Sequence, residues 1–273
     1  MSSHFVEAVR APPARSDSSA PAVSPLETND REGDSRIAPT KDESAPPIAP
    51  YRLLRLGLVD YAEGWNLQKS LVAARIAGEI PDTLLLLEHP HVYTLGRSGH
   101  ASNVLLDETA LAAKGAQLFW IDRGGDVTYH GPGQLVGYPI VHLERLGKDI
   151  HLHLRRIEET LIRALGDFGL EGRRDPAYTG VWVGDDKVAA IGVRVSKWVT
   201  SHGFALNVAT DLDYFANIIP CGIAGRGVTS LTRLLGREVS RGEAEAAVVR
   251  RFGEVFGVTA EAQAGTANSP SVS

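Results

Sequence analysis

The feature that most limits the fold is a long amphipathic helix followed at once by a run of strands. Between residues 149 and 168, apolar side chains recur at spacings of three and four, which predicts one apolar helical face. Residues 179–208 then give valine-rich and aromatic runs joined by short polar turns, which is typical of an antiparallel meander. Helices and strands therefore do not alternate regularly. This order favours an α+β domain with a mixed, largely antiparallel sheet over a doubly wound one.

The other periodic segments supply the remaining expected elements. They are a helix over 61–80, two short strands in 83–96 interrupted at Pro90, a short helix over 107–115, a strand over 116–122 and a helix over 240–256. Ser240 followed by Glu243 predicts a capping box at the start of the last helix.

Both ends of the chain differ in composition from its middle. Residues 1–49 are rich in Ser, Pro, Ala, Asp and Glu and lack helical or strand periodicity, so they bury too little apolar surface to offset the entropy of ordering. We expect a disordered extension over 1–49, one folded domain over 50–261 and a disordered tail over 262–273. The extension has no apolar secretory core, and its acidic residues argue against a mitochondrial transit peptide.

Bulk properties exclude several classes of protein. The net charge of −5 argues against nucleic-acid binding through a basic surface. No segment has the ~20 consecutive apolar residues of a membrane-spanning helix. One cysteine forms neither an internal disulfide nor a cysteine-based zinc site. That cysteine is therefore either a small buried hydrophobic residue or a reactive group.

Its sequence context favours the reactive group. Cys221 stands between Pro220 and Gly222, in NIIPCGIAGRGVTSL, and this places it on a turn. Loops lie at the surface and carry functional residues more often than regular elements do.

A glycine-rich segment, RGGDVTYHGPGQ (123–134), is the second candidate. Four glycines carry an entropic cost unless the backbone takes unusual angles or approaches another group closely. A plain turn between strands is the alternative, but Arg123, Tyr129 and His130 share the segment, which favours contact with a ligand. The phosphate-binding patterns GxxxxGK[ST] and GxGxxG are both absent.

The third candidate is the strand-rich segment 185–208. Lys187 opens a strand, where a solvated lysine at a hairpin end is the ordinary interpretation. Ala189, Ala190 and Gly192 are small, which indicates either space for a flat or elongated ligand or tight packing. Residues 203–205 supply a similar second wall.

Two histidine pairs have spacings that bear on metal binding. His89 and His91 flank Pro90 and are candidates for a pocket wall. His151 and His153 lie on the predicted helix 149–168, where i and i+2 residues do not face each other, so we expect them to be solvated. We predict no metal site.

Four segments in this order, RGGDVTYHGPGQLVGYPI, DDKVAAIGVRV, SHGFALNV and IIPCGI, closely resemble the signatures of the lipoyl/octanoyl transferase family, over about residues 52–256. The resemblance implies a single domain similar to biotin and lipoate protein ligases. It also implies that Cys221 is the acyl-thioester nucleophile and that Lys187 lowers the pKa of its thiol. The implied substrate-binding residues are Arg123, Gly124, Gly125, Asp126, Val127, Thr128, Tyr129, His130, Ala190, Ile191, Gly192, Gly203, Phe204 and Ala205.

The resemblance further implies a reaction. An octanoyl group would pass from acyl carrier protein to a lysine of lipoyl domains, those of 2-oxoacid dehydrogenases and the glycine cleavage H protein, in the cytoplasm. The donor is an activated thioester on phosphopantetheine, so no separate cofactor is expected. An ATP-dependent lipoate or biotin protein ligase and a lipoyl-domain amidotransferase are the alternatives.

Overall fold

The computed structural model describes residues 49–219 and 226–261. The predicted N-terminal extension, apart from Ala49, and the predicted tail lie outside these residues and stay predictions. Cys221 also lies outside the described residues.

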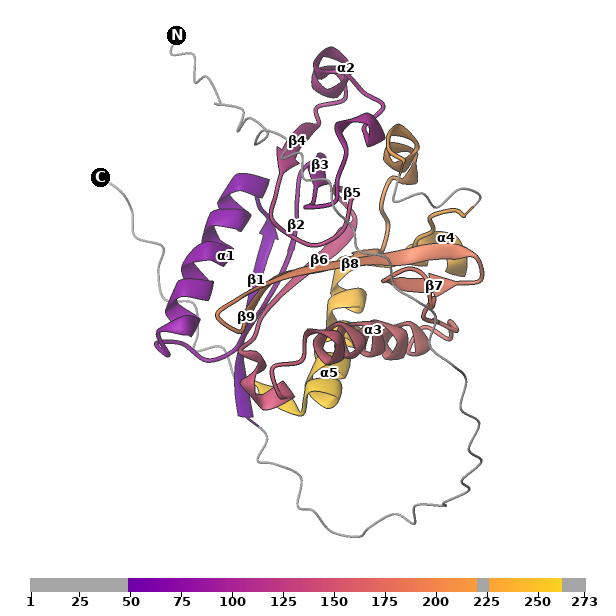
Figure 1. Ribbon diagram of the computed structural model, residues 1–273. Helices are drawn as coiled ribbons and strands as arrows, with labels where there is room; N and C mark the ends of the chain where they lie inside the picture. The colour runs from indigo at the N-terminus through magenta and orange to yellow at the C-terminus, as the bar shows by residue number, and fades with distance from the viewer. Residues whose placement is uncertain (1–48, 220–225, 262–273) are drawn as a thin grey trace, which may run out of the picture. The chain divides into compact units, whose positions relative to one another are not determined.

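The centre of the domain is a seven-stranded mixed sheet with the order β10-β1-β2-β6-β9-β8-β7 (Figure 1). Its strands are β1 (Ala49–Leu58), β2 (Thr83–Glu88), β6 (Gln134–Ile140), β7 (Val181–Val183), β8 (Asp186–Ser196), β9 (Val199–Asn207) and β10 (Val258–Ala260). The pairs β1–β10 and β1–β2 are parallel, and the other neighbouring pairs are antiparallel. The prediction of a mixed, largely antiparallel sheet is confirmed.

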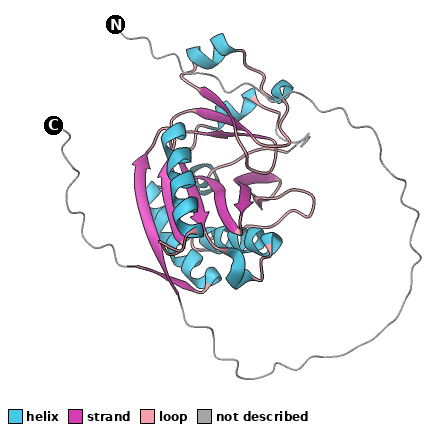
Figure 2. Cartoon of the chain, turned by 60° about the vertical axis from the view of Figure 1, so that its left-hand side comes forward, coloured by secondary structure: helices cyan, strands magenta, loops and turns pink. Residues whose placement is uncertain are grey.

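Helices cover both faces of this sheet (Figure 2). On one face, α3 (Ile150–Gly166) and α5 (Arg241–Phe256) pack against each other and enclose the largest apolar cluster with side chains such as Leu84, Leu135 and Leu206. On the other face, α1 (Tyr61–Ile76) packs over a smaller cluster. The sheet is therefore the middle layer of three.

A separate three-stranded sheet with the order β4-β3-β5 lies beside the main one. Its strands are β3 (Val92–Leu95), β4 (Gln117–Trp120) and β5 (Val127–His130), with α2 (Glu108–Ala113) connecting β3 to β4. The remaining short helices are η1 (Ala101–Asn103), η2 (Leu143–Leu146), η3 (Leu212–Asn217) and α4 (Leu231–Leu235).

Most expected elements are confirmed, but the glycine-rich segment is more ordered than a loop. Residues 127–130 form β5 and Gln134 begins β6, so only 123–126 and the turn at 131–133 are irregular. The glycine content led to the prediction of a loop and not of a strand. In this strand Val127 and Tyr129 lie on one face, and Thr128 and His130 lie on the other. β1 was also not expected.

The expectation for His153 is wrong. Its side chain has 0% exposure and lies edge-on to the ring of Phe256, while His151 is exposed as expected. His153 precedes Ile157 by four residues, so it lies on the same buried face of α3 as Ile157 and Leu161.

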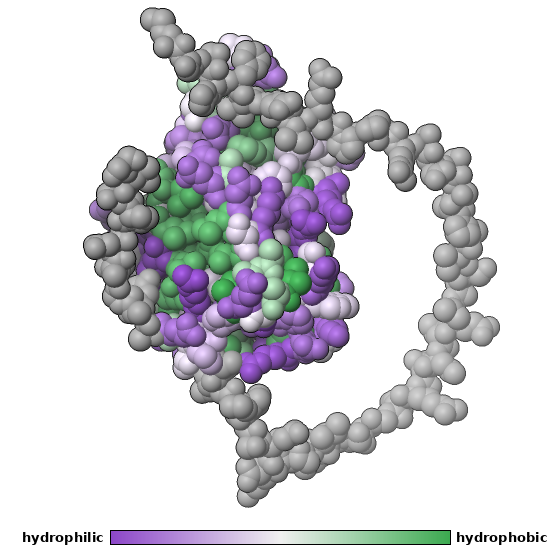
Figure 3. All heavy atoms as spheres, turned by 90° about the vertical axis from the view of Figure 1, so that its left-hand side faces the viewer, coloured by the Kyte–Doolittle hydropathy of each residue, from purple (hydrophilic) through white to green (hydrophobic). Residues whose placement is uncertain are grey.

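The α1 side of the molecule carries an apolar surface (Figure 3). Half-buried Leu54 and Leu56 of β1 and Val72 and Ile76 of α1 pack there against the smaller cluster. No helix within the described ranges is both long enough and apolar enough to span a membrane.

Candidate functional site

A cavity of about 530 Å³ borders the β8–β9 pair, β5 and the loop 123–126. Its volume falls in the range of about 300–1,000 Å³ that small-molecule sites occupy. Ile150 and Leu154 of α3 also border it. Thirteen of the implied substrate-binding residues line it, together with Lys187: Arg123, Gly124, Gly125, Asp126, Val127, Thr128, His130, Ala190, Ile191, Gly192, Gly203, Phe204 and Ala205.

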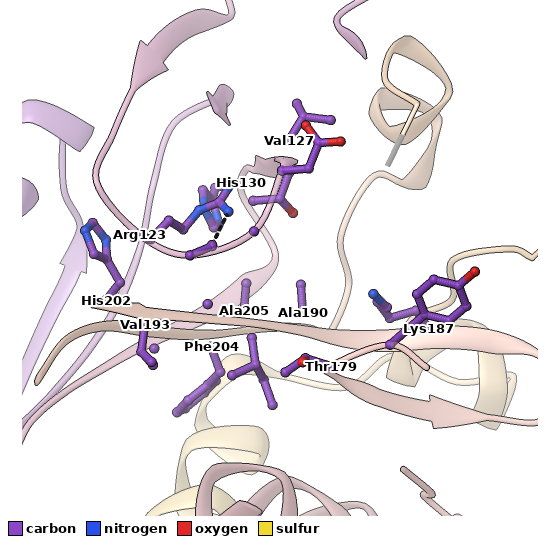
Figure 4. A pocket seen from close by; sticks show the side chains of 18 of the residues that line it. Arg123, Val127, His130, Thr179, Lys187, Ala190, Val193, His202, Phe204 and Ala205 are labelled. Atoms are coloured by element: carbon purple, nitrogen blue, oxygen red, sulfur yellow. Dashed lines mark hydrogen bonds between the residues drawn. The ribbon is translucent and has the colours of Figure 1, made fainter. Parts of the chain in front are cut away.

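Figure 4 shows how the strand pair meets the loop. Ala190 and Ala205 are paired across β8 and β9 and point toward Arg123 and His130. Phe204 points to the opposite face, where it packs in the large cluster. The two alanines therefore leave space under the loop, as the ligand interpretation of these small residues expected.

Gly192 is small for a different reason. A Cβ atom there would lie 3.0 Å from the carbonyl oxygen of Gly124, and the Gly124 N–H donates to the carbonyl of Val193 at 3.0 Å. The backbone of the loop therefore lies directly on β8 at this point. For Gly192 the tight-packing interpretation is correct.

Arg123 ties the loop to the neighbouring sheet. Its side chain is buried, and Nη2 donates to the backbone oxygen of Thr94 at 2.7 Å and to the Thr94 hydroxyl at 3.0 Å. Hydrogen bonds from a charged donor contribute more than neutral ones. Arg123 therefore fixes this wall of the cavity.

Asp126 connects the loop to the segment before Cys221. Its Oδ2 accepts a hydrogen bond from Asn103 Nδ2 at 2.6 Å, and the carbonyl of Asn103 accepts from the N–H of Ile219 at 2.8 Å. Ile219 stands two residues before Cys221 in the sequence. Asp126 thus helps, through Asn103, to hold the chain at Ile219.

Lys187 occupies the end of the cavity away from the loop (Figure 4). Its N–H donates to the carbonyl of Gly227 and its carbonyl accepts from the N–H of Thr229, both at 3.0 Å. The chain that follows Cys221 is therefore bound to β8 at Lys187. The two segments meet through backbone atoms, so this contact does not depend on side-chain rotamers.

The Trp182 ring and a second cation, Arg226, lie beside Lys187 at this end of the cavity. Nζ lies 4.8 Å from the centroid of Trp182, and the Arg226 guanidinium lies 5.0 Å from the same ring. Arg226 is paired with Asp175. Two cations at one end of an apolar cavity favour the anionic form of a neighbouring acidic group.

His130 lies on the loop side of the cavity and is almost fully buried. Its Nδ1 is 2.8 Å from Gln134 Oε1, and Gln134 Nε2 donates to Asn207 Oδ1 at 2.9 Å and to the backbone oxygen of Tyr129 at 3.1 Å. Burial is the main cause that lowers the pKa of His130 to about 3. The imidazole is therefore neutral at neutral pH.

His202 forms a second polar group at the cavity. Its Nε2 is 3.0 Å from Asp122 Oδ1, and Asp122 also pairs with Arg194. The hydrogen bond to His202 is the leading cause that lowers the pKa of Asp122. His202 has a φ of +56°, an uncommon backbone angle for a residue other than glycine.

Three predicted residues stand apart from the cavity lining. Tyr129 faces the core of the small sheet, with its hydroxyl 2.7 Å from His91 Nδ1, because it alternates with His130 along β5. Of the candidate wall histidines, His91 stacks on Tyr214, and His89 is buried behind the cavity with Nε2 2.7 Å from the Tyr138 hydroxyl. Neither lines the cavity.

Tyr61, Tyr138, Tyr178, Trp182 and Arg226 line the cavity but were missed by sequence reasoning. Arg226 lies within the Cys221 segment and Trp182 lies just before the segment 185–208, so the sequence offered a signal for both. Tyr61 comes from α1, and no motif in the sequence indicates that it lines the cavity. Within residues 49–219 and 226–261, no group of three or more His, Cys, Asp or Glu side chains is arranged to hold a metal ion.

Comparison with known proteins gives one family. Residues 60–253 match the model of the lipoyl protein ligase A/B catalytic domain. An octanoyltransferase of Rubrobacter xylanophilus is 59% identical over 203 residues, which cover 74% of this chain and 91% of the relative. An octanoyltransferase of Solibacter usitatus is 52% identical over 204 residues, which cover 75% and 92%.

The fold also matches solved structures. A bi-partite lipoate protein ligase from Thermoplasma acidophilum, described with its E2 lipoyl domain, superposes with a TM-score of 0.60 at 19% identity. The match covers 79% of this chain and 88% of that one. This likeness concerns the fold alone.

Proposed function

This chain belongs to the lipoyl protein ligase A/B catalytic domain family, and we propose that it carries an octanoyl group from acyl carrier protein to a lysine of a lipoyl domain by way of Cys221. It is an acyltransferase, an octanoyltransferase of protein lipoylation like its relatives at 59% and 52% identity. The donor, the acceptor lysine and the thioester intermediate are the proposed parts.

One observation carries the proposal. Lys187 lies at one end of an apolar cavity, and its backbone is bonded to the chain that follows Cys221. A cation beside a thiol favours the thiolate, which is the reactive form of cysteine. The cavity itself suits an unbranched acyl chain, because Ala190 and Ala205 leave its floor open.

The first half-reaction exchanges one thioester for another. The Cys221 thiolate attacks the carbonyl carbon of octanoyl phosphopantetheine, the bond from that carbon to the carrier sulfur breaks, and the released thiolate takes up a proton. The free energy of the thioester is retained, so no ATP is needed. This is why cysteine suits the role of covalent carrier.

The second half-reaction forms an amide. The neutral amine of the acceptor lysine attacks the same carbonyl carbon, the bond to Cys221 breaks, and the proton lost by the amine passes to the departing sulfur. The Lys187 ammonium stabilises that sulfur as an anion during both steps. No other cofactor is required by this chemistry.

The acceptors that we propose are the lipoyl domains of 2-oxoacid dehydrogenases and the glycine cleavage H protein. The solved relative described with its E2 lipoyl domain supports this class of acceptor. We place the reaction in the cytoplasm, because a cysteine nucleophile needs a compartment that keeps thiols reduced.

Mass spectrometry of the intact protein tests the intermediate. After incubation with octanoyl acyl carrier protein and without ATP, we expect one octanoyl adduct that hydroxylamine removes. Cys221→Ser is expected to accumulate no such adduct and to lose transfer to a lipoyl domain. Unchanged turnover in Cys221→Ser would end the proposal.

Two arms separate the alternatives. An ATP-dependent ligase would transfer free octanoate or lipoate only when ATP is present. An amidotransferase would use an octanoylated lipoyl domain in place of acyl carrier protein as donor. Robust transfer from the carrier protein without ATP excludes the ligase. The relative rates with the two donors decide between the octanoyltransferase and the amidotransferase.

A further inference from the structure

The hydrogen-bond chain behind His130 fixes which ring nitrogen carries the proton. Asn207 Nδ2 donates to the backbone oxygen of Thr229 at 3.0 Å, and Gln134 Nε2 donates to the backbone oxygen of Tyr129. Carbonyl oxygens only accept, so both amide groups have one orientation. Gln134 Oε1 is therefore an acceptor, and the Nδ1 atom of His130 must be the donor to it.

The other ring nitrogen then holds a lone pair. Among the residues that the structure describes, no group donates a hydrogen bond to His130 Nε2, and His130 lines the cavity. The ring of Tyr61 lies parallel to it, with 6.1 Å between the ring centroids. His130 Nε2 is not among the fully buried polar atoms without a partner, so the lone pair is open to the cavity that His130 lines.

On the basis of the proposed function, the length of β8 measured from Lys187 shows how far an acyl chain reaches toward His130. Lys187 and Val193 are six positions apart on β8, or about 20 Å at ~3.3 Å per residue. An extended eight-carbon chain is only about 9 Å long at ordinary bond lengths. With its carbonyl beside Lys187, the chain ends near Ala190 and Ala205, the two alanines that point toward His130 of β5 (Figure 4).

We propose that His130 sets the upper limit on acyl chain length. An octanoyl chain stops short of Nε2 and leaves this acceptor to water. A chain of ten or twelve carbons presses methylene groups against it, and the lone pair loses its hydrogen bond. A buried acceptor left unsatisfied disfavours such a complex by roughly tenfold or more.

The test compares acyl carrier proteins loaded with octanoyl and dodecanoyl groups. We expect His130→Leu to raise the ratio of kcat/KM for dodecanoyl over octanoyl by about tenfold, since leucine presents no acceptor. His130→Gln keeps a polar side chain and should retain the low ratio. As a matched control, His100→Leu makes the same change at an exposed residue outside the cavity lining and should leave the ratio near that of the wild type.

The outcomes are distinguishable from failure of the proposed function. If the wild type transfers no octanoyl group from the carrier protein, the proposed function fails. If the wild type transfers octanoyl well but His130→Leu shows the same dodecanoyl-to-octanoyl ratio, the length limit alone is overturned.

A measurement on the wild type covers the case in which His130→Leu does not fold. Long-range ¹H–¹⁵N spectra of the histidine rings, assigned by comparison with His130→Gln, should show His130 protonated on Nδ1 and not on Nε2. A proton on Nε2 would remove the acceptor from the cavity and overturn the proposal.

Discussion

The cavity and the helix layer formed by α3 and α5 each contain a buried histidine, His130 and His153, and the two side chains differ in their hydrogen bonding. Burial lowers the pKa of His130 to about 3 and that of His153 to about 4. His130 bonds to Gln134 through one nitrogen and turns the other into the cavity. Neither nitrogen of His153 has a hydrogen-bond partner within the described part of the chain.

Burial and a lowered pKa do not distinguish these two histidines. Both side chains have these properties, but only His130 has a network that selects one tautomer. Unsatisfied polar atoms in an apolar layer cost stability. We therefore expect changes around the cavity to alter turnover and changes in the helix layer to alter stability.

Replacing Lys187 should have the largest effect. We expect Lys187→Ala to reduce the rate of Cys221 acylation by roughly 100-fold or more at neutral pH, because the thiolate loses its cation. Single-turnover kinetics from pH 6 to pH 10 measure this, and the deficit should shrink as the pH rises. Lys187→Arg keeps the charge and is the control. An unchanged pH profile in Lys187→Ala would remove Lys187 from this role.

His153→Leu should act on stability instead. The folded pKa of about 4 lies below the ordinary value of 6.5, so the unfolded chain binds the proton first as the pH falls. His153 therefore destabilises the wild type progressively between pH 6.5 and pH 4, by up to ~3 kcal/mol. We expect His153→Leu to remove this part of the acid sensitivity.

Denaturant unfolding at several pH values, with His151→Leu as the exposed control, tests that expectation. At pH 7 the variant should also gain about 1–2 kcal/mol, since two unsatisfied buried nitrogens are removed. Octanoyl transfer should not change. Equal pH dependence in His153→Leu and wild type would contradict the argument.

Arg123 tests the boundary between the two regions, because it lines the cavity and also holds the loop. Arg123→Met removes the hydrogen bonds to Thr94, so we expect a loss of about 2 kcal/mol in the free energy of unfolding together with reduced transfer. Arg97 is exposed in the segment that follows β3, and only its backbone N–H contacts the loop, at the carbonyl of Arg123. Arg97→Met should therefore cost less than about 0.5 kcal/mol. A fully stable Arg123→Met would show that the loop does not need this bond.

The smallest expected effect is at the start of α5, where Ser240 and Glu243 form a capping box. Ser240→Ala should lower the free energy of unfolding by about 1 kcal/mol. Ser240 is not among the residues that line the cavity, so kcat/KM for octanoyl transfer should stay unchanged. A loss of transfer without a loss of stability would contradict the division between the two regions.

Sequence patterns predicted the regular helices and the β7–β9 meander because each has a periodic apolar face. They could not predict that His153 is buried, because histidine counts as a polar residue in any search for an apolar face. Nor could they reveal β5, whose strand alternation is hidden between glycines. Tyr61 reaches the cavity from α1 through the fold, and no local signal reports such a contact.

The candidate site was predictable where short motifs lie on the strands and loop that build it. Residues 123–128, 190–192 and 203–205 converge as the motifs implied. The partners of these residues, such as Thr94 for Arg123 and Asn103 for Asp126, come from distant segments. Only the folded chain brings them together.

The parallel pairing of β1 with β10 brings the two ends of the described domain together. Ala49 is opposite Val258, and the N–H of Glu261 donates to the carbonyl of Tyr51 at 2.8 Å. This pair lies at the opposite edge of the sheet from β7 and β8. A short peptide joining residues 261 and 49 would therefore give a circular permutant, opened for example at the exposed turn between β8 and β9, that keeps the same sheet order.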